Sequence, residues 1–388
     1  MNWKISKVDL IMFMLCFPFL QPWWFTTLGV IDFLYDIVKL GICAYVILMI
    51  FKKKTRFSSI SITYAVYRMY IFINTCVQSS FDIGYLSESI QYVCFIILLE
   101  YLIQKYKIRP LKSILFGFCV LLVLNILTYT PNGIIFEAPT ENFLLGIRTR
   151  VADLAIPAMG LSLYYFKTTK KGKKMMICAF CASILFFVLE WVATALLCTA
   201  IFLVLIFLEK FIYKKAQNTY HVFLMLAGIT LTFGVVFFNV QDSFATLIET
   251  LLHKEITLTG RTEIWAAAIP LIAKKWIWGY GFQNQGDFVS LYEFITTSHN
   301  QLLQTMYYGG VVGCVLYYIM PIRALRNCLK KENENFRLNA ILINTLFVLI
   351  VMGTVEICMD NIYFLIMLVF MHNCKSFAGE NGEIQVKE

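Results

Sequence analysis

Long apolar stretches recur along the chain, each of about 17–25 residues with few charged side chains, which is the length that an α-helix needs to cross a bilayer. Inside a bilayer the protein itself must pair every backbone N–H and C=O group, so only helices and closed β-barrels can span it. Barrel strands alternate apolar and polar residues, and these stretches do not alternate. The sequence therefore predicts an all-α protein that crosses a membrane repeatedly.

The composition supports this fold class, because 59% of the residues are hydrophobic and 15% are charged, whereas soluble domains carry roughly 25% charged residues. We predict one integral membrane domain over residues 1–388 with about twelve transmembrane helices. The first predicted span lacks the small-residue pattern of a cleaved signal peptide. The predicted spans are 8–24, 28–51, 58–80, 87–104, 110–130, 150–167, 175–190, 192–211, 219–240, 301–322, 337–354 and 357–373.

Lysine and arginine set the predicted orientation, because loops that stay in the cytoplasm carry most of the basic residues. With both termini inside, the inner segments hold 25 of the 33 Lys and Arg residues and the outer segments hold six. We therefore expect both termini to be cytoplasmic. The net charge of +9 then favours anionic lipid and does not require a nucleic-acid partner.

All six outer basic residues fall in two loops, residues 130–150 and 241–300. A loop as long as 241–300 is usually functional, so we predict that it is an extracytoplasmic catalytic loop. The shorter loop supplies Arg148 and Arg150, which are candidates for binding an anionic substrate. The alternative is that both are solvated loop charges.

The long loop contains a predicted amphipathic helix, about 262–276, that would lie on the outer membrane surface. Glu263 suits the positive end of the helix dipole, and Pro270 is expected to kink or divide the helix. Gly279 is expected to end it in a left-handed cap, and Trp265 is among the aromatic residues expected at the headgroup level. The apolar positions at helical spacing are Ile264, Trp265, Ala268, Ile269 and Ile272.

Two residues of this loop are candidates for chemistry. Arg261 begins the predicted helix, where free backbone N–H groups also favour an anion; the alternative is a pair with a lipid phosphate or with Glu255. His299 closes the loop, and histidine exchanges a proton near neutral pH. The alternative for His299 is a capping or packing role, but the polar neighbours Asn300 and Gln301 favour function.

Charged residues inside the spans are costly and need a partner. Arg68 is therefore expected to face protein, water or a substrate cavity, while Lys39 is expected to pair with Asp36 within its helix. The sequence has no Walker A motif, zinc-ligand spacing or dinucleotide fingerprint, so no cofactor is predicted. It also has no Asp-x-Asp pair to hold a divalent metal on a nucleotide sugar.

Two separated motifs carry a resemblance to a known family. They are GRTEIWAAAIPLIAKKWIWGYGF and SHNQLLQTMYYGGVVG, at the end of the long loop and the start of the next span. Over residues 260–313 the chain resembles the O-antigen ligase and O-antigen polymerase superfamily of bacterial envelope proteins. The matching residues are Arg261, Trp265, Gly279, Gly281, His299, Asn300, Leu303, Gly309 and Gly310.

The resemblance implies metal-independent glycosyl transfer at the outer face of the bacterial plasma membrane. The donor would be an oligosaccharide on undecaprenyl diphosphate, and the acceptor would be a second glycan. A flippase and a chain-length regulator are the implied protein partners. His299 would be the base and Arg261 would contact the diphosphate. From the residues themselves we also expect substrate binding by Arg148, Arg150, Glu263, Asn300 and Arg68, with Glu263 mainly orienting Arg261.

The chain departs from the family at one position, because many members carry a Ser-Arg pair where this sequence has Glu190 and Trp191. A second phosphate-binding cation must then come from elsewhere. The favoured function is polymerisation of repeat units into capsular, exo- or O-antigen polysaccharide, and the alternative is ligation to another acceptor. A polysaccharide exporter or flippase would also fit the spans, but it predicts repeated halves, which the sequence lacks.

The predicted orientation can be tested with single cysteines in a background without other reactive thiols. A cysteine at Gly286 should react with an impermeant thiol reagent in intact cells, because its loop is predicted to be outside. A cysteine at Asn333 should react only after permeabilisation. The reverse pattern would place the long loop in the cytoplasm.

Overall fold

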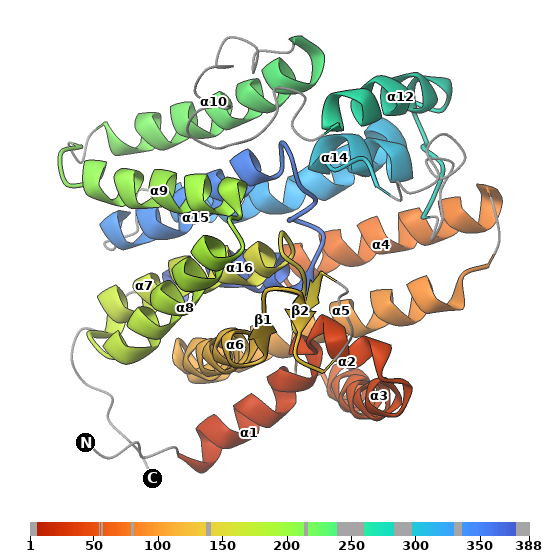
Figure 1. Ribbon diagram of the computed structural model, residues 1–388. Helices are drawn as coiled ribbons and strands as arrows, with labels where there is room; N and C mark the ends of the chain where they lie inside the picture. The colour runs from red at the N-terminus through yellow and green to blue at the C-terminus, as the bar shows by residue number, and fades with distance from the viewer. Residues whose placement is uncertain are drawn as a thin grey trace.

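The computed structural model describes residues 6–53, 55, 57–78, 81–136, 141–212, 216–238, 260–282, 297–329 and 336–377, and within them the chain is mostly helical (Figure 1). Of the predicted loop 241–300, residues 241–259 and 283–296 lie outside the described residues. The helices are α1 (Lys7–Cys16), α2 (Trp23–Thr27), α3 (Gly29–Phe51), α4 (Ser59–Gln78), α5 (Ile83–Tyr106), α6 (Arg109–Leu127), α7 (Val151–Thr169), α8 (Lys173–Leu189), α9 (Ala193–Leu208), α10 (Gln217–Phe238), α12 (Arg261–Lys274), α14 (Gln301–Leu329), α15 (Phe336–Met352) and α16 (Ile362–His372).

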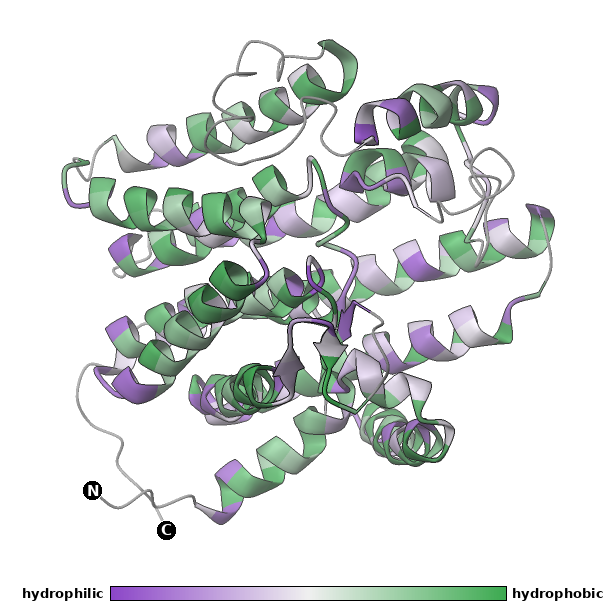
Figure 2. Ribbon diagram, viewed as in Figure 1, coloured by the Kyte–Doolittle hydropathy of each residue, from purple (hydrophilic) through white to green (hydrophobic). Residues whose placement is uncertain are grey.

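The described helices include five that are long and apolar enough to cross a membrane: Gly29–Phe51, Ile83–Tyr106, Arg109–Leu127, Asn218–Phe238 and Gln301–Leu329. Each of the twelve predicted spans contains helix, but several of these helices are shorter than a bilayer crossing. Figure 2 shows that α9 and α10 are hydrophobic along most of their length, whereas α12 has hydrophilic residues at both ends. An all-α membrane fold is thus supported, while the number of crossings stays a prediction.

Contacts between helix ends separate two faces of the bundle. At one face, Lys275 Nζ after α12 donates to Gln78 Oε1 at the end of α4 (2.6 Å). At the opposite end of α4, the Arg323 guanidinium of α14 donates to the Ser59 carbonyl oxygen (3.0 Å). The segment after α12 and Arg323 of α14 therefore contact opposite ends of α4.

The first predicted span is not one continuous helix. α1 ends at Cys16 and is followed by a 3-10 turn over Phe17–Leu20, and α2 then begins at Trp23. Pro18 and Pro22 explain the break, because proline has no N–H to donate and disfavours helical geometry in the residue before it. The chain therefore bends here before it enters α3.

Two short antiparallel hairpins occupy the loop before α7, and the sequence did not predict them. In the described part of this loop, β1 (Tyr129–Thr130) pairs with β2 (Gly133–Ile134), and β3 (Asn142–Phe143) pairs with β4 (Gly146–Ile147). Leu145 N–H is anchored by the buried Asn125 side chain of α6 (3.1 Å). The second hairpin ends three residues before Arg150, which is the N-cap residue of α7.

The helix α14 contacts α4, α12, α15 and α16, and its backbone breaks at Gly310 (φ 58°, ψ −159°). The segment after α12 lies along this break. Tyr280 N–H donates to the Tyr307 carbonyl (2.8 Å), and Val311 N–H donates to the Trp276 carbonyl (2.8 Å). The break therefore leaves backbone groups that the preceding loop satisfies, as a membrane interior requires.

The glycines of both family motifs meet at this junction. A Cβ on Gly310 would lie 2.3 Å from the backbone carbonyl of Ile277, and one on Gly279 would lie 2.6 Å from the backbone nitrogens of Gly309 and Gly310. Gly279 is left-handed as predicted (φ 73°), but it closes the turn after α12, not the helix itself. α12 also continues through Pro270 without dividing.

We predict that Gly310→Ala destabilises the protein, because it adds a clash with backbone and a positive φ, each costing roughly 1–3 kcal/mol. Gly313→Ala is the matched control, since its Cβ would find only ordinary contacts from 3.4 Å outward. Thermal denaturation of the purified variants in detergent should show a lower midpoint for Gly310→Ala alone. Equal midpoints would show that the junction tolerates a side chain.

Candidate functional site

Helix α12 packs its apolar stripe against protein. Ile264, Trp265, Ala268 and Ile272 are buried, and the last three belong to a small core that residues of α10 and α14 complete. Trp265 was expected at the headgroup level, but it is 1% exposed and its indole N–H donates to the Ser298 carbonyl (3.0 Å). One side chain thus ties α12 to the residue before His299.

His299 adopts a left-handed conformation (φ 47°), which is uncommon for a residue with a side chain. Its neighbours Ser298 and Asn300 are both fully buried, whereas the His299 side chain is 37% exposed. Ser298 N–H and its hydroxyl both donate to Gln304 Oε1, at 2.9 and 3.0 Å. The anchored neighbours therefore hold a sharp turn that presents the imidazole.

The residues after His299 hold the connection between α15 and α16. Asn300 caps α14 by accepting from Leu303 N–H (2.9 Å), and its Nδ2 donates to the Thr354 carbonyl (2.7 Å). Gln301 N–H donates to the Gly353 carbonyl (2.8 Å), while its side chain accepts from Met359 N–H (2.9 Å). These contacts fix residues 353–359 beside the histidine.

Glu356, in this fixed connection, lies between the two residues singled out by the sequence. Its Oε1 accepts a hydrogen bond from Arg261 Nη2, and its Oε2 lies 3.9 Å from His299 Nδ1. The side chains of Arg261 and Glu356 are 17% and 12% exposed. The structure therefore brings Arg261 and His299 together through a carboxylate.

Sequence reasoning missed Glu356. A signal was available, because an acid between two apolar spans is costly and usually has a functional partner. It was predicted that Glu263 orients Arg261, but Glu263 is exposed, and the carboxylate that contacts Arg261 belongs to Glu356. Glu255, the alternative partner for Arg261, lies outside the described residues.

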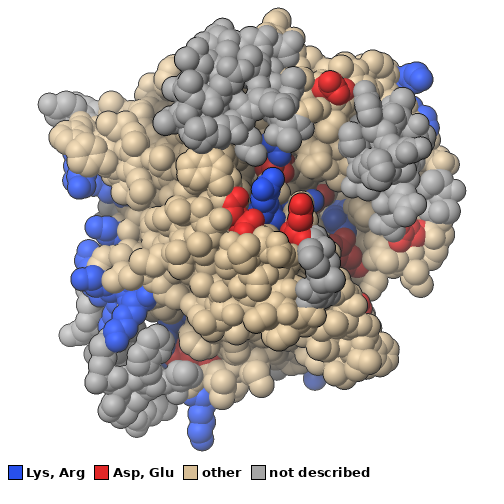
Figure 3. Space-filling view, viewed as in Figure 1, with Lys and Arg blue, Asp and Glu red and all other residues tan. Residues whose placement is uncertain are grey.

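The remaining predicted cations differ in their surroundings. Arg150 donates to the carbonyl of Ile357, next to Glu356 (3.0 Å), and lies 3.5 Å from Asp153. Arg148 is exposed. Arg150 therefore joins the group around Glu356. Figure 3 shows basic and acidic side chains close together near the middle of the face in view.

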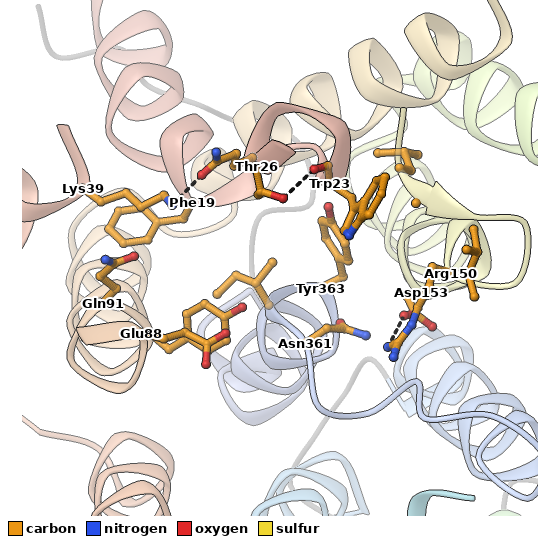
Figure 4. Close-up of a pocket in the computed structure, with 16 residues that line it drawn as sticks. Phe19, Trp23, Thr26, Lys39, Glu88, Gln91, Arg150, Asp153, Asn361 and Tyr363 are labelled. Atoms are coloured by element: carbon orange, nitrogen blue, oxygen red, sulfur yellow. Dashed lines mark hydrogen bonds and ion pairs between the residues drawn. The ribbon is translucent and has the colours of Figure 1, made fainter. Parts of the chain in front are cut away.

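Arg68 is buried and faces protein. Its guanidinium donates to Glu88 (2.7 Å) and to the Ser89 hydroxyl (2.8 Å), and it stacks on the Tyr85 ring at 4.1 Å. Glu88 in turn lines a cavity of about 580 Å³ that also reaches Arg150 (Figure 4). Arg68 thus supports the cavity wall through Glu88. Among the described residues, no group of three His, Cys, Asp or Glu side chains lies close enough to hold a metal ion.

The geometry agrees with a comparison against protein families. Residues 191–318 match the family model of O-antigen ligase. The matched region covers about a third of the chain and contains Arg261 and His299, so the resemblance seen in the sequence is confirmed. Glu356 and Arg150 lie outside it. A comparison with curated proteins finds no match to this chain.

Asn300 has two possible roles that a substitution can separate. The sequence predicts that it binds substrate, whereas the structure buries its amide in hydrogen bonds to protein. Asn300→Asp keeps the oxygen that caps α14 but places a carboxylate oxygen against the Thr354 carbonyl. We expect the free energy of unfolding to fall by about 1–3 kcal/mol, which is the cost of an unpaired buried polar group, as measured by denaturation of the purified variant. A variant as stable as the parent would favour the substrate contact instead.

Proposed function

We propose that the protein transfers lipid-linked glycans, as the matched family does, and that it polymerises repeat units carried on undecaprenyl diphosphate at the outer face of the bacterial plasma membrane. The match over residues 191–318 and the apolar helices support O-antigen ligase or polymerase-type transfer at a membrane. The observation that carries the proposal is the Arg261–Glu356–His299 group, which combines a cation and a base at one face.

The base would be His299. With Nδ1 on the side of Glu356, Nε2 is left to face an acceptor hydroxyl, and Glu356 would fix the tautomer and stabilise the imidazolium that forms. The hydroxyl oxygen attacks the anomeric carbon of the donor while its proton moves to His299. A single displacement of this kind inverts the configuration at the anomeric carbon.

The leaving group would be the lipid diphosphate, which gains negative charge as the glycosidic bond breaks. The guanidinium of Arg261 can bind two phosphate oxygens in a fixed geometry, which stabilises this charge without a metal. Glu356 already holds the Arg261 side chain in place. Arg261 would therefore lose little conformational entropy when it binds the diphosphate. Arg150 lies near enough to Glu356 to contribute to the same field.

The donor and the acceptor would both be glycans on a lipid carrier. A flippase would deliver the donor to the outer face, and a chain-length regulator would act on the product. Both termini would be cytoplasmic. Ligation to a different acceptor uses the same chemistry, and the product separates the two reactions, because a polymerase gives a ladder of repeat units on the lipid carrier.

We predict that Arg261→Lys severely reduces transfer, because lysine keeps the charge but loses the planar fork that grips two oxygens. The unpolymerised lipid-linked repeat unit should accumulate, as seen on a gel of lipid-linked glycans from cells that carry each variant. Purified protein should keep its activity in the presence of chelator. Full activity of the lysine variant, or chelator inhibition reversed by a divalent ion, would refute the metal-free role of Arg261.

Glu356→Gln should reduce transfer strongly, because a neutral amide cannot hold Arg261 as an ion pair or stabilise a charged His299. The matched control is Glu263→Gln, which changes an exposed acid on the same face and should have a small effect. His299→Ala should lose roughly 10²–10⁴ in rate, the typical contribution of a general base. Membrane levels of each variant are measured alongside, and equal transfer by Glu356→Gln and Glu263→Gln would remove Glu356 from the mechanism.

A further inference from the structure

The cavity of about 580 Å³ lies outside the region that matches the ligase family. Its lining comes from residues 19–21 before α2, from α2, α3 and α5, from the β4 hairpin and from the starts of α7 and α16. Its size is within the range of about 300–1,000 Å³ that is usual for small-molecule sites. We propose that this cavity binds the acceptor as a saccharide, through its hydroxyl groups and ring faces, and does not bind the diphosphate. The proposal rests on the function proposed above.

The charges of the lining argue against a phosphate site. Lys39 and Arg150 are the cations, and Glu88 and Asp153 are the acids, so the lining is balanced. Both cations also have carboxylate neighbours, since Lys39 lies 3.2 Å from Asp36 and Arg150 lies 3.5 Å from Asp153. A diphosphate would need a surplus of positive charge, whereas a balanced set offers donors and acceptors to a neutral ligand.

The uncharged lining suits a sugar. The lining holds three carboxamides. Asn361 uses its own to cap α16, whereas Gln21 and Gln91 each keep an N–H and an oxygen lone pair beyond their hydrogen bonds to protein, which matches the dual character of hydroxyl groups. Trp23 and Tyr363 add aromatic rings, whose electron-rich faces accept the C–H face of a pyranose. In Figure 4, Lys39 and Gln91 lie at the left of the cavity and Arg150 and Asp153 at the right, with both rings between these groups.

The polar lining is built into apolar surroundings at a cost. Lys39 is 13% exposed, on a helix whose composition is that of a membrane span, and Gln21 accepts a 2.5 Å hydrogen bond from it. On the α5 side, Glu88 is held by the buried Arg68. Polar groups inside membrane helices usually mark a substrate path. Here Gln21 holds Lys39 on one side of the cavity, and Arg68 holds Glu88 on the other.

The cavity adjoins the proposed reaction centre at Arg150. This side chain lines the cavity and also donates to the carbonyl of Ile357, the residue after Glu356. A saccharide in the cavity would therefore have one end near the carboxylate that neighbours His299. The proposal requires this end to reach His299, which removes the proton of the acceptor hydroxyl, while the donor diphosphate lies on the Arg261 side.

Protection of an introduced thiol tests the site without requiring turnover. Ile147→Cys places a half-exposed thiol in the lining, and Ile135→Cys places one on the neighbouring hairpin away from the cavity. Purified protein in lipid nanodiscs is treated with a charged thiol reagent, and the parent protein gives the background from native cysteines. The probes are the repeat-unit oligosaccharide, cleaved by mild acid from the host's own lipid carrier, and inorganic pyrophosphate.

We expect the oligosaccharide to slow labelling of Ile147→Cys by about threefold at twice its Kd, and to leave Ile135→Cys unchanged. Pyrophosphate should protect neither position. Gln91→Leu should abolish the protection, because it removes a donor and an acceptor from the lining, whereas His299→Ala should keep it. Protection by pyrophosphate, or labelling that the oligosaccharide does not slow, would overturn the proposal.

The two proposals can fail separately. If His299→Ala still transfers glycan but the oligosaccharide protects Ile147→Cys, the saccharide site stands and the assigned base is wrong. If His299→Ala loses transfer and no protection is seen, the catalytic group stands and the acceptor binds elsewhere.

Discussion

The pairing of the loop segment 276–282 with the broken helix α14 is the interaction on which the rest of the site depends. A helix inside a membrane cannot leave backbone groups unpaired, and α14 breaks at Gly310 where the loop supplies the missing partners. Asn74 of α4 adds a third element, because its Nδ2 donates to the carbonyls of Trp278 (2.7 Å) and Tyr308 (3.1 Å). α12 is thereby held over the start of α14, next to His299.

The connection between α15 and α16 is the second fixed part. The main chain and side chains of Asn300 and Gln301 hold it at Gly353, Thr354 and Met359, and the carboxylate of Glu356 is presented between these points. The histidine turn and this connection therefore position each other. A catalytic group assembled from two such segments can keep its geometry before any substrate arrives.

The residue pattern along the chain predicted the helix of the site and its buried face, but it did not predict the contacts between segments far apart in sequence. The predicted helix 262–276 agrees with α12 (Arg261–Lys274), its apolar stripe is the buried face, and the Lys39–Asp36 pair is present. These features repeat at helical spacing and can be read from neighbours in the chain. The Arg261–Glu356 contact joins residues far apart in sequence, and the break at Gly310 depends on a loop that only the folded chain places beside it, so neither was predicted.

The lining of the cavity lies outside residues 191–318, whereas Arg261 and His299 lie within them, and Arg150 is the lining residue that also contacts the connection carrying Glu356. Substitutions in Trp23, Gln91 or Ile147 leave every contact of the histidine turn in place. Apart from Arg150, selection can therefore act on the two parts independently. Under the two proposals made above, a lineage that changes its surface sugars could adapt the α2–α5 wall and inherit the displacement chemistry without alteration.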